Sequence, residues 1–370
     1  MTSGPTILFA GGGTGGHLYP GIAVAQALSE IRSDAKPLFL CTTRAIDSTI
    51  LRPSGFEFIE QPIVPPVHSA SGLLRFWKSW RDTKDLVRRI LRERKPAAVL
   101  GLGGYAAGVA VKVAASRGVK TAILNPDVIP GRANQYLMRY ARAVCCQFEE
   151  TRRRVSESLR SRLTITGCPI RRDLLALPAR AEAAARLGLD TNLNTLVVTG
   201  ASQGAATINQ AMLALVGTIQ WQGWQILHLS GADHASAVQT GYRQQNAPAV
   251  VIDFTPNMGD VWAVADLCVC RAGASTCAEL TACGVASILM PYPFHKDMHQ
   301  RANAQVLADA GAAAIVDDTK DATTNAAALG PIINSLMYDA RRRAAMSGGA
   351  RSLARPNAAA AVAQVVTKFL

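Results

Sequence analysis

One histidine near the start of the chain follows directly on a run of glycines, a combination that could do chemistry. The segment reads Phe9-Ala10-Gly11-Gly12-Gly13-Thr14-Gly15-Gly16-His17. The apolar stretch before it, 6–9, is typical of a buried strand, and apolar residues at helical spacing follow it. Glycines have no side chain to cover their backbone N–H groups, and accessible N–H groups at a helix N-terminus favour binding of a phosphate. His17 at the mouth of such a loop indicates a reacting site.

A second run of small residues lies in the middle of the chain and reads Gly200-Ala201-Ser202-Gln203-Gly204-Ala205. It follows the apolar stretch 195–198 and precedes a helical pattern, so it predicts a second phosphate site with the Ser202 hydroxyl as a donor. It is not a Walker A loop, because no Gly-Lys-Ser/Thr follows. The alternative is a tight strand-to-helix turn that requires small residues.

The segment 271–279 is a further candidate, and it reads Arg-Ala-Gly-Ala-Ser-Thr-Cys-Ala-Glu. The pair Thr276 and Glu279 fits a capping box at a helix N-terminus. In the alternative interpretation, the Glu279 carboxylate accepts hydrogen bonds from the vicinal hydroxyls of a ribose.

A polar cluster follows at 291–303 and leads into another expected helix. Its Gln300 and Asn303 are interpreted as donors to sugar hydroxyls or carbonyls. His295 and His299 are four residues apart, a spacing compatible with metal binding, but no third ligand is evident and no metal is expected.

The spacing of Gly11, Gly13 and Gly16 also fits the dinucleotide fingerprint. That fingerprint requires an acidic residue at the end of the second strand, whereas this strand ends in Arg44, and Asp47 is not well placed. A dinucleotide-binding oxidoreductase therefore stands as an alternative from another class, together with a non-catalytic nucleotide-sugar-binding module.

Composition indicates a large folded protein with an anionic partner. The chain has 370 residues, of which 49% are hydrophobic and 18% charged, and its formal net charge is +13. This charge predicts a nucleic acid, a phosphorylated substrate or an acidic membrane as partner. No signal peptide is expected, because the N-terminus lacks a basic region followed by an apolar one, and no transmembrane helix is expected, because no apolar run reaches about 18 residues. The eight cysteines are expected to be reduced core residues.

Residues 71–96 hold nearly half of the excess charge, with nine Lys or Arg against three Asp or Glu. Apolar side chains fall at helical spacing on one face, either as a core stripe or as a surface that enters an anionic bilayer. Two tryptophans within four residues favour the bilayer. The residues assigned to this membrane patch are Leu73, Leu74, Arg75, Phe76, Trp77, Lys78, Trp80, Arg81 and Lys84.

Strand-like and helix-like stretches alternate along the whole chain, which is typical of parallel sheets covered on both faces. The expected strands are 6–9, 37–41, 57–59, 97–100, 121–124 and 143–146, then 195–198, 225–229, 250–254, 266–270, 286–290 and 313–316. The pattern predicts two doubly wound α/β domains, 1–172 and 173–355. Their loops would line one cleft, since ligands bind beyond the carboxyl ends of such strands.

Several motifs occur together in a fixed order, and the combination is more specific than any one of them. They are the segments 11–17, 103–105, 166–171, 202–204, 271–279 and 299–303. On these motifs the chain resembles the MurG family, the N-acetylglucosaminyltransferases that complete lipid II of peptidoglycan. The likeness implies the GT-B fold, in which two Rossmann-like domains face each other across a cleft. It also implies that a C-terminal helix, 356–369, crosses back to the first domain.

The resemblance implies transfer of GlcNAc from UDP-GlcNAc to the muramyl 4-hydroxyl of lipid I, with inversion at the anomeric carbon. Ser202 and Gln203 would meet the UDP phosphates, and Glu279 would meet the ribose. The implied donor-binding residues are Thr14, Gly15, Arg171, Ser202, Gln203, Gly204, Glu279, Gln300 and Asn303.

The first domain would bind the acceptor by similarity. The residues implied for the lipid diphosphate are Gly12, Gly13, Gly16, Gly103, Gly104 and Tyr105. The segment 73–80 matches the family's membrane-docking surface in position and character. The resemblance therefore implies a peripheral protein on the cytoplasmic face of the plasma (inner) membrane. Its partners would be UDP-GlcNAc, the undecaprenyl-diphosphate-linked lipid I and an anionic membrane surface, with no nucleic acid and no tightly bound cofactor.

Inversion requires a base on the acceptor hydroxyl and stabilisation of the departing UDP anion. His17 is a candidate base, because a helix N-terminus disfavours protonation of its imidazole. In the alternative, His17 only hydrogen-bonds the loop or the diphosphate.

Two positions depart from the family pattern. The loop Asn125-Pro126-Asp127 replaces the usual Glu-Gln-Asn, and Cys168 stands where an Asn is usual. Either Asp127 shares the base role, or the acceptor contacts have changed. The second possibility leaves a GT-B transferase for another lipid or small acceptor as an alternative function.

Overall fold

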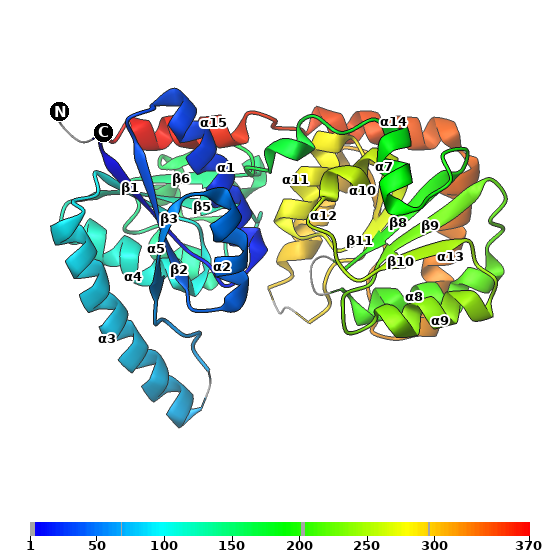
Figure 1. Ribbon diagram of the computed structural model, residues 1–370, viewed down its shortest axis with the longest axis horizontal. Helices are drawn as coiled ribbons and strands as arrows, with labels where there is room; N and C mark the ends of the chain where they lie inside the picture. Colours follow the sequence, from blue (N-terminus) through cyan, green and yellow to red (C-terminus); the bar gives the residue numbers. More distant parts are fainter. Residues whose placement is uncertain (1–3, 68, 201–203, 295–296) are drawn as a thin grey trace. The chain divides into compact units, whose positions relative to one another are not determined.

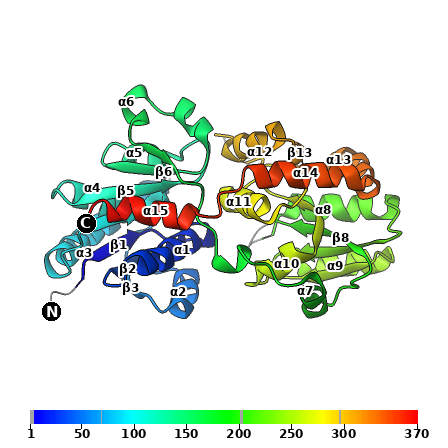
Figure 2. The ribbon, with the colours of Figure 1, turned by 90° about the horizontal axis from the view of Figure 1, so that it is seen from above.

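The computed structural model describes residues 4–67, 69–200, 204–294 and 297–370. The chain divides into two compact units. The first ends at Arg171 and takes in Pro356–Leu370, and the second runs from Arg172 to Arg355. Each unit contains a parallel sheet with helices on both faces (Figures 1 and 2), which confirms the predicted fold class. Within the described ranges, every helix is too short or too polar to cross a bilayer.

The sheet of the first unit has seven parallel strands within the described residues, in the order β3-β2-β1-β4-β5-β6-β7. They are β1 (Thr6–Ala10), β2 (Lys36–Thr42), β3 (Glu57–Gln61), β4 (Ala98–Gly101), β5 (Lys120–Asn125), β6 (Ala143–Cys146) and β7 (Leu163–Ile165). The sequence predicts the first six and misses β7, because three residues are too few to show a period. β1 pairs with both β2 and β4, so the winding of the sheet reverses between the loops after β1 and β4. Doubly wound sheets bind ligands at this position.

Alternate side chains of β1 face opposite helical layers. Leu8 packs with α3 and α4, whereas Phe9 packs with α1 and α15. Val362 of α15 has no exposed surface, so the C-terminal helix is part of the core of the first unit. The helices of this unit are α1 (Gly15–Ile31), α2 (Ala45–Leu51), η1 (Arg52–Ser54), α3 (Ala70–Glu93), α4 (Gly104–Ala115), α5 (Arg132–Leu137), η2 (Glu149–Arg154), α6 (Glu157–Arg160) and α15 (Ala358–Thr367).

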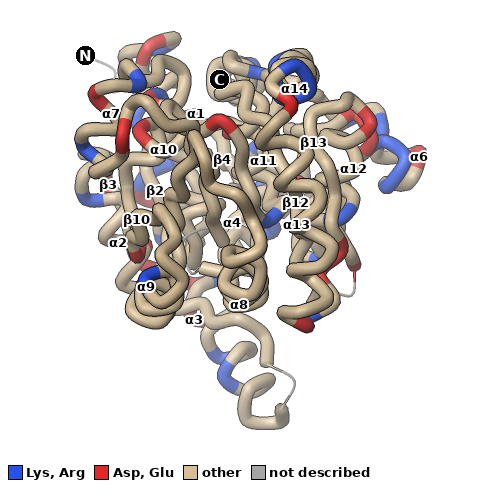
Figure 3. Tube along the Cα trace, turned by 90° about the vertical axis from the view of Figure 1, so that its right-hand side faces the viewer, with Lys and Arg blue, Asp and Glu red and all other residues tan. Residues whose placement is uncertain are grey.

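The N-terminal half of α3 extends beyond the other elements of the first unit (Figures 1 and 3). Phe76 and Trp80 are half-buried and pack against the core that α3 shares with α4. Leu73, Leu74 and Trp77 are exposed, the last two at 73% and 63%. The predicted membrane patch is therefore corrected: Phe76 and Trp80 belong to the core stripe, and the other apolar members face solvent.

The second unit has six parallel strands within the described residues, in the order β10-β9-β8-β11-β12-β13, and the sequence predicts all six. They are β8 (Asn194–Thr199), β9 (Trp224–Leu229), β10 (Ala249–Ile252), β11 (Ala265–Cys270), β12 (Ser287–Leu289) and β13 (Ala313–Ile315). β8 pairs with both β9 and β11, so the winding of this sheet reverses between the loops after β8 and β11. This position is the switch point of a doubly wound sheet. The helices are η3 (Arg172–Leu174), α7 (Arg180–Leu187), α8 (Ala206–Leu215), η4 (Val216–Thr218), α9 (Ala235–Gln244), α10 (Met258–Val264), α11 (Ala274–Cys283), α12 (His299–Asp309), α13 (Ala322–Tyr338) and α14 (Ala340–Ser352).

Candidate functional site

A buried carboxylate holds the glycine loop of the first unit in place. Asp47, in the first turn of α2, has no exposed surface, and its two oxygens accept the N–H of Gly13 at 2.8 and 2.9 Å. Its Oδ2 also accepts the N–H and the hydroxyl of Thr42, each at 2.8 Å. One side chain therefore ties the loop after β1 to the end of β2.

The same contacts explain why glycines occupy this loop. Gly12 has a φ of +154°, and a Cβ on it would lie 2.2 Å from an Asp47 oxygen. The Gly13 carbonyl accepts a hydrogen bond from the Arg44 guanidinium at 2.8 Å, while its N–H is bound to Asp47. The Gly13 N–H is therefore engaged within the protein, and the contact predicted for Gly13 with the acceptor diphosphate stays a prediction.

His17 lies in the first turn of α1 and packs against the turn after β4. Its Nδ1 is 3.2 Å from the hydroxyl of Thr14, the N-cap residue. A Cβ on Gly103 would approach the imidazole to 3.3 Å, and one on Gly104 would approach it to 3.0 Å. Both glycines also have positive φ angles, +104° and +70°. Two motifs that are far apart in the sequence therefore meet at one imidazole.

The pKa of His17 lies below its ordinary value of 6.5, chiefly because burial removes water from the charged ring. The Gly12 carbonyl and the carboxylates of Asp127 and Asp47 act in the opposite direction, since they stabilise the imidazolium. The side chain is consequently neutral at neutral pH, and the groups that would stabilise a transferred proton are already beside it.

Asp127 is half-buried in the loop after β5, near enough to His17 to act on its charge. The loop is held by Asn125, whose side-chain amide donates to the Asp127 carbonyl at 2.8 Å. Asn134 of α5 donates in turn to Asn125 Oδ1 at 3.1 Å and to the Leu124 carbonyl at 2.9 Å. The structure thus brings both candidate catalytic residues together, and their roles stay predictions.

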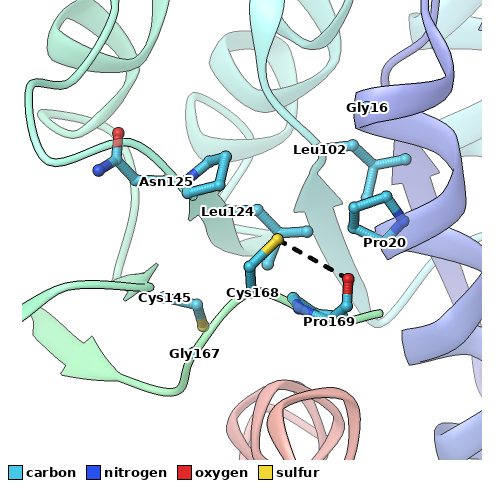
Figure 4. Close-up of a pocket in the computed structure, with 10 residues that line it drawn as sticks. Gly16, Pro20, Leu102, Leu124, Asn125, Cys145, Gly167, Cys168 and Pro169 are labelled. Atoms are coloured by element: carbon cyan, nitrogen blue, oxygen red, sulfur yellow. Dashed lines mark hydrogen bonds between the residues drawn. The ribbon is translucent and has the colours of Figure 1, made fainter. Parts of the chain in front are cut away.

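A pocket lies beside this site, between the start of α1 and the loops after β5 and β7 (Figure 4). Cys168 lines it, with its thiol directed to the Pro169 carbonyl at 3.7 Å. Asn125 and Pro126 line it as well, so the two departures from the family pattern meet at one surface. The lining residues are Gly16, Pro20, Leu102, Leu124, Asn125, Pro126, Cys145, Gly167, Cys168 and Pro169.

Arg171 lies against the start of α1, and Tyr105 lies close to the glycine loop 11–16. The Arg171 guanidinium lies 5.1 Å from the centre of the Tyr19 ring in α1, a cation–π distance. The Tyr105 hydroxyl is 3.4 Å from the position that a Cβ of Gly13 would take. Burial raises the pKa of Tyr105, partly offset by Arg44, so its hydroxyl keeps its proton and can donate a hydrogen bond.

In the second unit, a buried ion pair organises the loops at the carboxyl ends of the strands. Arg271, directly after β11, donates to Asp318 Oδ2 at 2.8 Å, and the two side chains are 8% and 0% exposed. It also donates to the Met290 and Pro291 carbonyls at 3.0 and 3.3 Å and to the Thr207 hydroxyl at 2.6 Å. One guanidinium therefore joins the loops after β11, β12 and β13 to the first turn of α8.

Gly204 marks a tight turn before α8. Its φ is +70°, and a Cβ on it would lie 1.9 Å from the Ser230 carbonyl oxygen. The alternative interpretation of the segment 200–205, a tight turn that requires small residues, therefore holds at Gly204. Ser202 and Gln203 lie outside the described residues, as does His295, and their predicted contacts stay predictions.

Glu279 is not part of a capping box. α11 begins at Ala274 with Gly273 as its N-cap, no side chain caps it, and Thr276 lies inside the helix. Glu279 Oε2 instead accepts the indole N–H of Trp262 from α10 at 2.9 Å. The half-buried carboxylate therefore stays a candidate for the ribose.

The two amides predicted to meet the sugar hold loops together. Gln300 Oε1 accepts the Tyr292 N–H at 2.9 Å, and the Asn303 side chain donates to the Ala272 carbonyl at 3.1 Å. Asn303 has no exposed surface, and its predicted contact with the sugar stays a prediction. The contact predicted for Gln300 stays a prediction. Among the described residues, no three side chains gather as metal ligands.

Comparison with known proteins identifies the family. Residues 7–146 match the N-terminal domain of glycosyltransferase family 28, and residues 195–360 match its C-terminal domain. Similar proteins from Desulforudis audaxviator (33% identity, 98% of each chain) and Geobacter metallireducens (36% identity, 95% of each chain) share one name. Both are called UDP-N-acetylglucosamine--N-acetylmuramyl-(pentapeptide) pyrophosphoryl-undecaprenol N-acetylglucosamine transferase.

The chain belongs to the MurG family. The crystal structure of Acinetobacter baumannii MurG superimposes with a TM-score of 0.75 at 25% identity, covering 98% of this chain and 99% of that one. A UDP-glucosyltransferase from Polygonum tinctorium has a TM-score of 0.74 at 18% identity over 100% and 99% of the two chains, and shows the shared fold. The predicted family, GT-B fold and glycosyltransferase class are therefore confirmed.

The sequence alone does not predict two residues of the site in this MurG-family chain, Asp47 and Trp262. Asp47 lies 34 residues from the glycine whose N–H it binds, and only its position soon after the second strand is a signal. Trp262 gives no signal, because a tryptophan in an apolar helical stretch is most simply a core residue.

Replacing Asp47 with Asn should loosen the glycine loop. The amide has one acceptor oxygen where the carboxylate has two, so the hydrogen bonds from Gly13 and Thr42 cannot all be kept. We expect the free energy of unfolding of the first unit to fall by about 2–3 kcal/mol, measured by urea denaturation. Asp85→Asn, at an exposed ion pair in α3, is the matched control and should change it by less than about 0.5 kcal/mol. Equal effects of the two variants would contradict the anchoring role.

Proposed function

We propose that this chain transfers GlcNAc from UDP-GlcNAc to the muramyl 4-hydroxyl of lipid I, with inversion at the anomeric carbon. The observation that carries the proposal is the position of the His17 imidazole, which lies against two glycines at the switch point of the first sheet and close enough to Asp127 to interact with its charge. Membership of the MurG family supports the same substrates, since its relatives are named for them.

In this mechanism His17 removes the proton of the acceptor hydroxyl. The hydroxyl oxygen forms a bond to the anomeric carbon, the bond from that carbon to the UDP oxygen breaks, and the proton passes to the imidazole. The resulting imidazolium is stabilised by the Gly12 carbonyl and the Asp127 carboxylate, which already favour the charged ring. We therefore assign His17 as the base and Asp127 as the group that stabilises its charged form.

The second unit binds the donor in this proposal. The N-terminus of α8 and the side chains of Ser202 and Gln203 would bind the UDP phosphates, and Glu279 would accept hydrogen bonds from the ribose hydroxyls. Arg271 does not contact the donor directly, since it is buried and bound within the protein. Its role is to hold the donor loops in one arrangement. The departing UDP anion would be stabilised by the helix N-terminus and by Arg171, and no tightly bound cofactor enters the mechanism.

We further propose that the chain docks on an anionic membrane as a peripheral protein at its cytoplasmic face. The exposed Leu73, Leu74 and Trp77 would enter the interface, and the exposed basic side chains of α3 would meet lipid phosphates (Figure 3). An acceptor with a polyprenyl chain stays in the membrane, so the enzyme must come to it.

Transfer of label from UDP-GlcNAc to a lipid I analogue tests the proposed function. We expect labelled lipid II with wild-type protein, detected by chromatography and mass spectrometry. His17→Ala should lower kcat by at least about a hundredfold and leave the Kd of UDP within about twofold, because general-base catalysis contributes that much and His17 does not bind the donor. Absence of label in the lipid with active donor binding would refute the proposed acceptor. Unchanged kcat in His17→Ala would refute the base.

Replacing Trp77 with Glu should release the protein from anionic vesicles. The change removes an exposed indole from the interface and adds a charge that the lipid repels. We expect binding to vesicles of phosphatidylglycerol and phosphatidylethanolamine to weaken at least about tenfold in a sedimentation assay. Phe254→Glu, at a similarly exposed aromatic residue of the second unit, is the control and should bind as wild type does. Equal binding by Trp77→Glu and wild type would contradict the docking surface.

A further inference from the structure

We propose that Trp262 is a positioning residue for the donor, acting through Glu279 on the ribose diol of a nucleoside diphosphate. The inference rests on the proposed function, in which Glu279 accepts the ribose hydroxyls. Its basis is one hydrogen bond, from Trp262 Nε1 to Glu279 Oε2 at 2.9 Å. Trp262 is 3% exposed, so it does not touch a ligand itself.

The indole controls the orientation of the carboxylate. An indole has a single N–H donor and no acceptor, so it fixes one oxygen of Glu279 in one direction. A carboxylate offers about four acceptor positions, and a vicinal diol needs two of them with defined geometry. Glu279 lies in the second turn of α11, on the same face as Ser275 and Thr276 of the first turn.

The position of the indole is fixed by an ion pair on its own helix. Asp260, two residues before Trp262 in α10, binds Arg186 of α7 through both oxygens, at 2.7 and 3.1 Å. α7 is in turn held by Arg180, which donates to the Val264 carbonyl at 3.0 Å and to Asp266 at 2.7 Å. These contacts hold α7 and α10 together, and the hydrogen bond from Trp262 positions Glu279 relative to them.

A role limited to packing would have a different consequence. A phenyl ring is smaller than an indole but occupies part of the same space, so Trp262→Phe keeps part of the apolar contacts and removes the N–H. If the N–H acts only on stability, the affinity of every UDP analogue should change by the same factor. If it orients Glu279, the loss should depend on the ribose hydroxyls of the ligand.

The experiment measures the Kd of UDP and of 2′,3′-dideoxy-UDP by calorimetry, with full-length wild type and Trp262→Phe. We expect the Kd of UDP to rise about fivefold in the variant, the size of one ordinary net hydrogen bond, and the Kd of the dideoxy analogue to stay unchanged. In turnover, KM for UDP-GlcNAc should rise by a similar factor at nearly constant kcat. Equal factors for the two ligands, or an unchanged Kd of UDP, would overturn the proposal.

Two further variants keep the result interpretable. Trp221→Phe is the matched control, because the Trp221 indole also donates one hydrogen bond in the second unit, to the Val216 carbonyl at 3.0 Å, and it should leave the Kd of UDP unchanged. Glu279→Ala combined with Trp262→Phe should bind UDP no more weakly than Glu279→Ala alone, and additive losses would overturn the proposal. An unchanged Kd of UDP in Glu279→Ala alone would refute the ribose assignment on which the proposal rests. Labelled transfer to lipid tests the proposed function separately.

Discussion

The geometry of the first unit depends on the buried charge of Asp47. A carboxylate without exposed surface is tolerated only when hydrogen bonds replace its water, and here they come from Gly13 and Thr42. These bonds draw the glycine loop onto the end of β2 and set the point at which α1 begins. His17, in the first turn of that helix, consequently reaches Gly103 and Gly104 across the switch point.

The second unit uses a buried charge of the opposite sign for the same purpose. Arg271 donates to Asp318 and to two carbonyls in loops at the carboxyl ends of the strands, and to Thr207 in the first turn of α8. Burial alone would raise the pKa of Asp318, but hydrogen bonds from Thr207, Lys320, Asn325 and Arg271 outweigh it and hold that pKa below its ordinary range. The carboxylate stays charged, and the loops that would receive a nucleotide sugar are held by the protein's own contacts.

Sequence patterns predict the strands well because a buried parallel strand is a short continuous apolar run between helical periods. They also predict the glycine loops and His17, since positive φ angles and close ring contacts admit only glycine. They fail where a partner comes from a distant element. The bond from Trp262 to Glu279 and the burial of Phe76 and Trp80 depend on tertiary packing, which local spacing does not encode. The pair Thr276 and Glu279 fits a capping box by spacing alone, yet the helix begins two residues before Thr276.

Burial against the glycine turn keeps His17 neutral and able to accept a proton. An NMR titration of the full-length protein with labelled histidine tests it most directly, with the His17 signal assigned from its absence in His17→Gln. We expect a pKa for His17 below the ordinary value of 6.5, so that the imidazole is largely neutral at neutral pH. A measured pKa at or above 6.5 would show that burial does not disfavour the charged ring, and would refute the proposed cause of its neutrality.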